Sequence, residues 1–312
     1  MNMNDIQPMT AAIVQAHGDR FGTIVPPKVV FQTDHPVYRA AKQACATLGF
    51  IDADAECLAC AWHAQTLRTG HFDARAWPEA PVDFGLGAFP PATRSDAFPP
   101  CPERLGLYAV LPDAAWVARM AHAGVPTVQL RFKSTDAAAI DREVAAAIGA
   151  VRGTGALLFV NDHWQAASAA GAYGVHLGQE DLDALTPDAL QRLRASGMRL
   201  GVSTHGYAEM VRADAVSPSY IAMGAVFPTT LKKMATAPQG IARLGAYARL
   251  LRGYPQVAIG GIDAERLPAV LATGVGSVAV VRALITAEDP ASTAAQWTRA
   301  VADCTPTSLS AR

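Results

Sequence analysis

The sequence has little charge, little cysteine and little lysine. Charged residues make up 17% of the 312 residues, against roughly 25% in soluble domains, while hydrophobic residues reach 51%. This balance excludes intrinsic disorder for most of the chain. The formal net charge of -1 and the pI near 6.7 provide no overall field for nucleic acid or an anionic membrane surface. Any phosphate chemistry must therefore depend on local clusters of charge.

Features of exported or membrane proteins are also missing. The five cysteines are odd in number and irregularly spaced, which argues against a disulfide framework. The N-terminal MNMNDIQPMT lacks the basic and then apolar pattern of a secretion signal, and no run of 18 apolar residues is free of charge. We therefore expect a cytoplasmic protein that binds neither nucleic acid nor membrane.

Proline marks the organisation of the chain. Seven of the 21 prolines fall within residues 78–102, which predicts a Pro/Gly-rich linker with little regular structure. It separates an N-terminal extension, residues 1–77, from a domain over 103–305. One or two helical patterns occur in the extension, and the clearer one, ECLACAWHAQTLRTG, is expected to end at Gly70.

The extension shows no clear function. Cys57, Cys60 and His63, with His71 nearby, invite comparison with a zinc site, but their spacing is not that of a zinc finger. Thiols buried on one helix explain the CxxC more simply. Whether the CxxC binds metal stays open, as do the role of residues 1–102 and the oligomeric state.

The second domain has a regular alternation of elements. Short β-branched runs alternate with Ala- and Leu-rich helical stretches, which is typical of βα units and a parallel sheet. Eight such units in about 200 residues predict an α/β fold, a compact (β/α)8 TIM barrel with an extra N-terminal extension. An open doubly wound sheet is the alternative, but no Gly-rich fingerprint follows the first strand. The expected strands are 105–111, 127–132, 156–160, 173–177, 199–203, 220–224, 256–260 and 277–281.

The second expected strand ends in cationic side chains. In such barrels the chemistry gathers at the C-terminal ends of the strands. Alternation points Gln129, Arg131 and Lys133 inward if Leu130 and Phe132 face the helices. This set favours a polyphosphate site, with arginine as a bidentate fork and lysine as a point charge. In the structural alternative, Arg131 pairs with a core carboxylate and Lys133 is a solvated strand end.

Two acidic side chains follow the next strands. Asn161 and Asp162 end the third strand, and Asp181 lies in the loop after the fourth. Carboxylates facing a cationic strand suit Mg²⁺ that is held jointly with substrate phosphates. Alternatively, Asp162 caps the helix that begins at His163.

The fifth and sixth strands are followed by hydroxyl-bearing and lysine-bearing loops. Ser203, Thr204 and His205 form a turn that could simply cap the next helix. The loop after the sixth strand contains Lys232 and Lys233. The chain has only five lysines, and three of them lie in the two candidate phosphate loops. We expect Lys232 to serve the site and Lys233 to be solvated.

The last two strands end in residues suited to phosphate. Gly260 and Gly261 follow the seventh strand, where glycine lets backbone amides approach a ligand closely. Val281 and Arg282 follow the eighth, and barrels often bind phosphate at these two loops.

Assembled in order, these segments resemble the thiamine-phosphate synthase family over residues 103–290. The matching segments are QLRFK, NDHW, YGVHLGQEDL, GVSTH, PSYIAMGAVFPTT, APQG, VAIGGI and ATGVGSVAVV. The resemblance implies a transferase of thiamine biosynthesis. It would join a hydroxymethylpyrimidine diphosphate to a hydroxyethylthiazole phosphate, giving thiamine phosphate and pyrophosphate.

The resemblance also implies roles for individual residues. The magnesium ligands would be Asp162 and Asp181, and the residues acting in catalysis Arg131, Lys133 and Lys232. The pyrimidine diphosphate would bind at Gln129, Leu130, Arg131, Phe132, Lys133, Asn161, Ser203 and Lys232. The thiazole phosphate would bind at Thr229, Thr230, Leu231, Gly261, Val281 and Arg282. Two positions depart from the family: Leu231 stands where a hydroxyl residue is usual, and Arg282 where serine is common.

We expect a dissociative reaction in which pyrophosphate leaves first and the thiazole nitrogen traps the pyrimidine-methyl cation. No protein nucleophile is then needed, and His176 is expected inside the barrel in a supporting role. Two alternatives stay open: a thiazole tautomerase-like barrel and a non-catalytic ligand-binding or regulatory homologue. The sequence also leaves open whether the chain forms a homo-oligomer and whether an upstream pyrimidine kinase docks on it.

Overall fold

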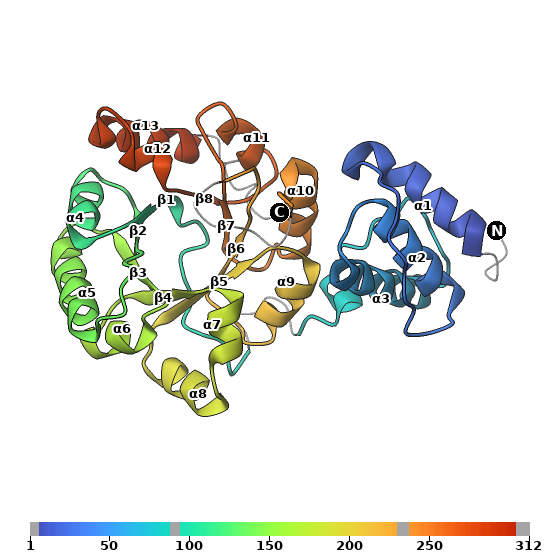
Figure 1. The fold of residues 1–312 in the computed structure, drawn as a ribbon, viewed down its shortest axis with the longest axis horizontal. Helices are drawn as coiled ribbons and strands as arrows, with labels where there is room; N and C mark the ends of the chain where they lie inside the picture. The colour runs from blue at the N-terminus through green and yellow to red at the C-terminus, as the bar shows by residue number, and fades with distance from the viewer. Residues whose placement is uncertain (1–5, 88–93, 230–236, 304–312) are drawn as a thin grey trace, which may run out of the picture.

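The computed structural model describes residues 6–87, 94–229 and 237–303. Eight parallel strands form a closed barrel in chain order, surrounded by helices, and three N-terminal helices lie against one side of it (Figure 1). The predicted α/β fold, a (β/α)8 barrel with an N-terminal extension, is therefore confirmed. Within the described ranges, no helix is both long and apolar enough to cross a membrane.

The barrel strands lie where the β-branched runs predict them, to within two residues. The largest difference is at the second strand, which ends at Leu130 and not at residue 132, so Arg131 and Lys133 lie in the loop that follows. The strands are β1 (Gly106–Leu111), β2 (Thr127–Leu130), β3 (Leu157–Asn161), β4 (Gly174–Leu177), β5 (Arg199–Thr204), β6 (Tyr220–Met223), β7 (Gln256–Ile259) and β8 (Ser277–Val280). Pairing of β1 with β8 closes the ring, with Gly106 beside Ser277.

Helices follow the strands around the outside. Two helices separate β4 from β5, and two follow β8. They are α4 (Ala114–His122), α5 (Ala137–Val151), α6 (Trp164–Ala170), α7 (Gln179–Ala184), α8 (Pro187–Ala195), α9 (Tyr207–Asp214), α10 (Gly240–Leu250), α11 (Leu267–Leu271), α12 (Arg282–Ile285) and α13 (Pro290–Asp303).

The N-terminal part, residues 6–87, is called the head here. It contains three helices where the sequence suggested one or two: α1 (Ile6–Phe21), α2 (Pro36–Thr47) and α3 (Asp52–Thr69). Gly70 ends α3 in a left-handed conformation, as its position predicts. A single 3-10 turn, η1 (Pro81–Phe84), follows.

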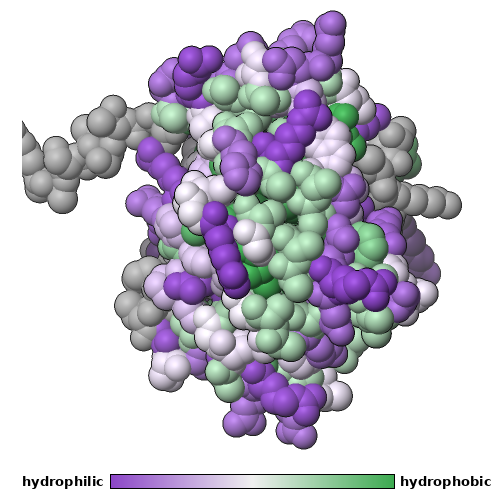
Figure 2. All heavy atoms as spheres, turned by 90° about the vertical axis from the view of Figure 1, so that its left-hand side faces the viewer, coloured by the Kyte–Doolittle hydropathy of each residue, from purple (hydrophilic) through white to green (hydrophobic). Residues whose placement is uncertain are grey.

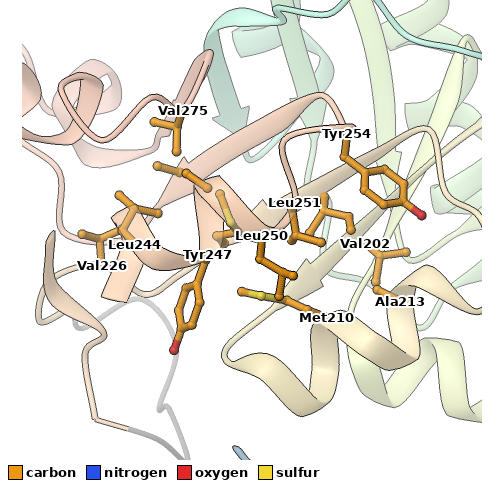
Figure 3. Packing of buried hydrophobic residues seen from close by; sticks show 14 of the residues in the cluster. Val202, Met210, Ala213, Val226, Leu244, Tyr247, Leu250, Leu251, Tyr254 and Val275 are labelled. Atoms are coloured by element: carbon orange, nitrogen blue, oxygen red, sulfur yellow. The ribbon is translucent and has the colours of Figure 1, made fainter. Parts of the chain in front are cut away.

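Head and barrel share one hydrophobic core. A continuous cluster of buried side chains runs from Met9 and Trp62 in the head to Tyr207 and Leu244 on the barrel helices. Figure 3 shows part of its barrel side, where Val202 of β5 lies close to α9 and α10. A smaller, separate cluster fills the inside of the barrel. The head is therefore packed against the barrel as part of one core.

The opposite side of the molecule carries small apolar residues among charged ones. Figure 2 looks at the side of α4 and α5, away from the head. Here α5 exposes Ala138, Ala145 and Ala146 beside Arg142. On this face, exposed alanine side chains thus take surface positions, in keeping with the low charge content of the sequence.

Candidate active site

A cavity of about 680 Å³ opens at the C-terminal ends of the strands. This size lies within the range of small-molecule sites. Of the residues predicted for the site and described in the structure, those that line the cavity are Gln129, Arg131, Lys133, Asn161, Asp162, Asp181, Ser203, Thr229, Gly261, Val281 and Arg282. One cavity thus brings together predicted residues from seven of the eight strand ends.

The cations after β2 line this cavity, whereas their apolar neighbours do not. The side chains of Leu130 and Phe132 pack in the layer between strands and helices. Among the described residues, no carboxylate lies within ion-pair distance of Arg131 or Lys133, so the alternative that Arg131 pairs with a core carboxylate is wrong. These two cations are available to an anionic ligand.

Asp162 and Asp181 lie against each other in the cavity wall. Partial burial and the charge of Asp181 raise the pKa of Asp162 to about 6, while the positive charge of Arg131 opposes the shift. The Asp162 side chain does not cap α6, so the capping alternative is wrong. Asp162 also takes a left-handed backbone conformation, with φ of 64°, which is uncommon for a residue other than glycine.

Two adjacent carboxylates repel each other unless a proton or a cation lies between them. Their hard oxygen atoms and the neighbouring cations fit a Mg²⁺ ion that completes its shell with substrate phosphates and water. Within the described ranges, no set of three or more His, Cys, Asp or Glu side chains is arranged to hold a metal. The two carboxylates alone would therefore hold the ion weakly without a phosphorylated ligand.

A chain of hydrogen bonds crosses the floor of the cavity. The Gln129 amide nitrogen donates to the Tyr108 hydroxyl (3.1 Å), which lies 2.8 Å from the Tyr220 hydroxyl. That hydroxyl contacts His176 Nδ1 (2.7 Å), and His176 Nε2 contacts Ser203 Oγ (2.8 Å). The chain joins Gln129 and Ser203, two predicted ligand residues, through three buried side chains.

The sequence did not lead us to predict the two tyrosines of this hydrogen-bond chain, because they lie within apolar strand segments. They could have been found as hydroxyl-bearing residues that alternation along the strand places on the inner face of the barrel. Burial raises the pKa of both Tyr108 and Tyr220 above the usual value, so both stay neutral. His176, expected inside the barrel in a supporting role, is buried and bonded through both ring nitrogens.

Ser203 and Thr204, which were expected in a turn, are the last two residues of β5, and their hydroxyls do not cap α9. Ser203 Oγ contacts His176, and Thr204 Oγ1 donates to the Ala222 carbonyl (3.1 Å). His205 Nδ1 lies 2.6 Å from Glu209 Oε2. All three residues line the cavity.

The other wall is formed after β6, β7 and β8. Gly261 has φ of +65°, and a Cβ there would lie 2.6 Å from the Pro228 carbonyl, so only glycine fits. Thr229, Val281 and Arg282 also line the cavity. Thr230, Leu231 and Lys232, which were predicted for the site, lie outside the described residues, as does Lys233.

The CxxC of the head has other neighbours. Cys60 Sγ donates to Glu56 Oε1 (3.7 Å), and the His63 ring stacks on His35 with 3.7 Å between centroids. Cys57 and Cys60 are both free thiols.

Comparison with known proteins agrees with this geometry. The family described as thiamine monophosphate synthase matches residues 107–284. A thiamine-phosphate synthase of Neisseria meningitidis serogroup B is 54% identical over 193 residues, which are 62% of this chain and 93% of that protein. One from Cronobacter sakazakii is 54% identical over 192 residues, covering 62% and 90%. The solved thiamine phosphate pyrophosphorylase from Pyrococcus furiosus is 28% identical, with a TM-score of 0.57, and the match covers 64% of this chain and 96% of that one.

Proposed function

The chain belongs to the thiamine monophosphate synthase family, and we propose that it condenses 4-amino-2-methyl-5-(diphosphomethyl)pyrimidine with 4-methyl-5-(2-phosphoethyl)thiazole. The products are thiamine phosphate and pyrophosphate. The observation that carries this proposal is the convergence of Arg131 and Lys133 with the Asp162–Asp181 pair in one cavity.

Each substrate is assigned one side of the cavity. The pyrimidine diphosphate would lie over the floor chain between Gln129 and Ser203, with its phosphates toward Arg131, Lys133 and Lys232. Its aminopyrimidine ring would meet hydrogen-bonding groups that the tyrosines hold in place. The thiazole phosphate would lie on the glycine side, at Thr229 to Leu231, Gly261, Val281 and Arg282.

The reaction breaks the C–O bond between the pyrimidine methylene group and the diphosphate. The electron pair leaves with the pyrophosphate oxygen, and the thiazole ring nitrogen then gives its lone pair to the methylene carbon. Arg131, Lys133 and Lys232 would stabilise the charge that develops on the leaving oxygen, which is electrostatic catalysis by groups already in place. The apolar walls and the buried floor would keep water from the cationic carbon.

Asp162 and Asp181 are the residues that would hold Mg²⁺. When bound, the ion would neutralise part of the diphosphate charge. The raised pKa of Asp162 supports this assignment, since a pair of carboxylates left without a cation partly protonates.

A thiazole tautomerase would need a general base beside the thiazole phosphate and no diphosphate site. The cations and carboxylates after β2, β3 and β4 favour the synthase. A cytoplasmic location completes the proposal and is supported by the free thiols of Cys45, Cys57, Cys60 and Cys101.

The direct test is pyrophosphate release by the purified protein. With both substrates and Mg²⁺, pyrophosphate and thiamine phosphate should form in equal amounts, and neither substrate alone should release pyrophosphate. Conversion of the thiazole without pyrophosphate would identify a tautomerase. Binding of both substrates without turnover would identify a regulatory homologue.

A second test addresses the carboxylate pair. Asp162→Asn should shift the dependence of the rate on Mg²⁺ concentration to higher values, because one anionic ligand is lost. An unchanged magnesium titration would remove Asp162 from the ligand set. Asp183→Asn, which changes an exposed carboxylate on α7 paired with Arg212, is the control.

A further inference from the structure

Helix α9 follows β5, the strand that carries Ser203, and its N-cap residue provides no side-chain cap. Three barrel helices are capped by their own side chains, α4 by Asp113, α5 by Asp136 and α8 by Thr186, whereas α6, α10, α11 and α12, like α9, have no such cap. The corresponding position of α9 is Gly206, which has no side chain. The first amides of α9 therefore need an acceptor from elsewhere.

The acceptor comes from the head. Asp54 on α3 receives a hydrogen bond from the Ala208 amide (2.9 Å) and another from the Tyr207 amide. Asp54 is 3% exposed, and burying a carboxylate costs free energy. The hydrogen bonds from the amides at the positive end of α9 are the main interactions that offset this cost. Asp54 stands 154 residues before the amide that it caps.

Gly206 is shaped for this contact. A Cβ built there would lie 2.1 and 2.6 Å from the two oxygens of Asp54 and 2.7 Å from its Cγ. These are the three nearest atoms that the added carbon would meet. The backbone at Gly206 is extended, so the need for glycine is steric, and the three nearest atoms that would clash all belong to Asp54.

The contact is reciprocal and surrounded by apolar packing. Arg243 of α10 donates to the Gly49 carbonyl (2.7 Å) and the Leu48 carbonyl (3.3 Å) at the end of α2, and it lies over the Phe50 ring. Tyr207, the first residue of α9, is fully buried and accepts from Trp77 Nε1 (3.0 Å). Each unit thus caps a helix of the other, through hydrogen bonds that are partly buried.

Only His205 and Gly206 separate β5 from α9, so this joint lies next to the cavity. Ser203, Thr204 and His205 line the cavity, and the Ser203 carbonyl accepts from the Gln179 side chain (2.7 Å). A shift of the first turn of α9 would therefore move Ser203 relative to His176. The same shift would not move the wall of the cavity that the residues after β7 and β8 form.

We propose that Asp54 of the head is a positioning residue for the active site: by capping α9 it fixes the end of β5 and the residue after it, Ser203 to His205, which receive the pyrimidine substrate. The proposal rests on the proposed function for the identity of that substrate. The head thereby acts in the reaction without touching either substrate.

The test measures KM for each substrate separately, in the full-length protein. Asp54→Ala should raise KM for the pyrimidine diphosphate and leave KM for the thiazole phosphate unchanged. We expect a rise of about tenfold, which is the free energy that a lost helix cap costs, converted to an affinity. Asp54→Asn keeps an oxygen acceptor and should restore most of the loss. Asp52→Ala is the matched control, because it removes a solvent-exposed carboxylate from the same helix and should change neither KM. Equal changes in both KM values, or no rescue by asparagine, would overturn the proposal.

A double-mutant cycle tests the contact itself. Gly206→Ala should give the same selective rise in KM, because its methyl group displaces the carboxylate. In the Asp54→Ala background the same methyl group has room, so Gly206→Ala should add little. Additive effects would show that the two residues act independently and would refute the proposal. If Asp54→Ala does not fold, Gly206→Ala and Asp54→Asn decide: the first must raise KM for the pyrimidine diphosphate and the second must not.

Amide exchange separates this proposal from the proposed function. If the wild-type protein releases no pyrophosphate, the proposed function fails, and the role of Asp54 is then decided by hydrogen exchange. The Ala208 amide should be protected in the wild type and exchange at least tenfold faster in the Gly206→Ala variant. Equal protection in both would refute the capping role.

Discussion

The head and the barrel use charge in opposite ways. In the head, Lys42 is almost fully buried and its amine contacts Glu56 (2.7 Å) and Asp52 (3.1 Å). In the barrel, Arg131 and Lys133 face a cavity without a carboxylate within ion-pair distance among the described residues. The head thus holds a buried cation in ion pairs, whereas these two cations of the barrel cavity have no carboxylate partner within that distance in the described part of the chain.

The largest expected effect comes from separating the two parts. A chain that begins at Glu103 would expose Tyr207, Leu244 and Tyr247, which the head now helps to cover. It would also remove Arg94, whose guanidinium contacts Asp214 (2.7 Å). We expect this chain to aggregate or to unfold far below the wild-type temperature, as measured by solubility and thermal unfolding. Wild-type melting and turnover would show that the barrel is independent of the head.

The next effect concerns the barrel cations. Arg131→Ala and Lys232→Ala should each lower kcat by 10²–10³-fold, about 3–4 kcal/mol, because each removes a group that we propose stabilises the leaving pyrophosphate. Their melting temperatures should stay close to wild type. Near wild-type turnover in either variant would remove that residue from the catalytic set. Lys28→Ala, in the head, is the control for loss of a lysine charge.

The pH dependence of the free energy of unfolding tests the contact between Asp54 of the head and α9 of the barrel. Burial raises the pKa of Asp54 to about 6, while its bond to Ala208 and the charge of Arg243 oppose the shift and Glu209 adds to it. The folded state then binds the proton more tightly than the unfolded state, whose pKa is near 3.8. This contribution to stability is complete below pH 4 and is lost as pH rises to about 6.

Asp54→Asn removes this titration. Its free energy of unfolding relative to wild type should therefore rise between pH 4 and pH 6, by up to about 3 kcal/mol. Denaturant unfolding of both proteins at several pH values measures the difference. A difference that does not change with pH would contradict the assignment.

The smallest effect is expected for the buried lysine of the head. Lys42→Ala removes the ion pair with Glu56, leaves the Val30 carbonyl without its Lys42 donor and should lower the free energy of unfolding by about 1–3 kcal/mol. The kcat of the folded protein should not change. A loss of turnover with an unchanged free energy of unfolding would contradict the structural role of Lys42 and with it the contrast between head and barrel.

The sequence predicts the barrel well because its signals are local. Each β-branched run is bounded by glycine, proline or a polar residue, and alternation along β2 and into the residue after it sorts Gln129 and Arg131 from Leu130. Position at a strand end is enough to bring these side chains to one cavity. The same alternation could have found Tyr108 and Tyr220.

The joint could not be predicted in this way, because its partners are far apart in the chain. Asp54 looks like an ordinary acidic residue in the first turn of α3, and Gly206 looks like an ordinary turn glycine. Only the packing of α3 against α9 gives them a shared role. For the same reason Ser203 and Thr204 were plausible caps until the structure showed their other bonds.

Gly206 also gives a way to recognise this arrangement in other chains. Where a barrel of this family carries a head that caps α9, the position before the helix must be glycine, with an acidic residue on the third helix of the head. A barrel without such a head is free to place serine, threonine or aspartate there and to cap itself. In this chain Gly206 leaves room for the Asp54 carboxylate, so the barrel relies on the head for this acceptor.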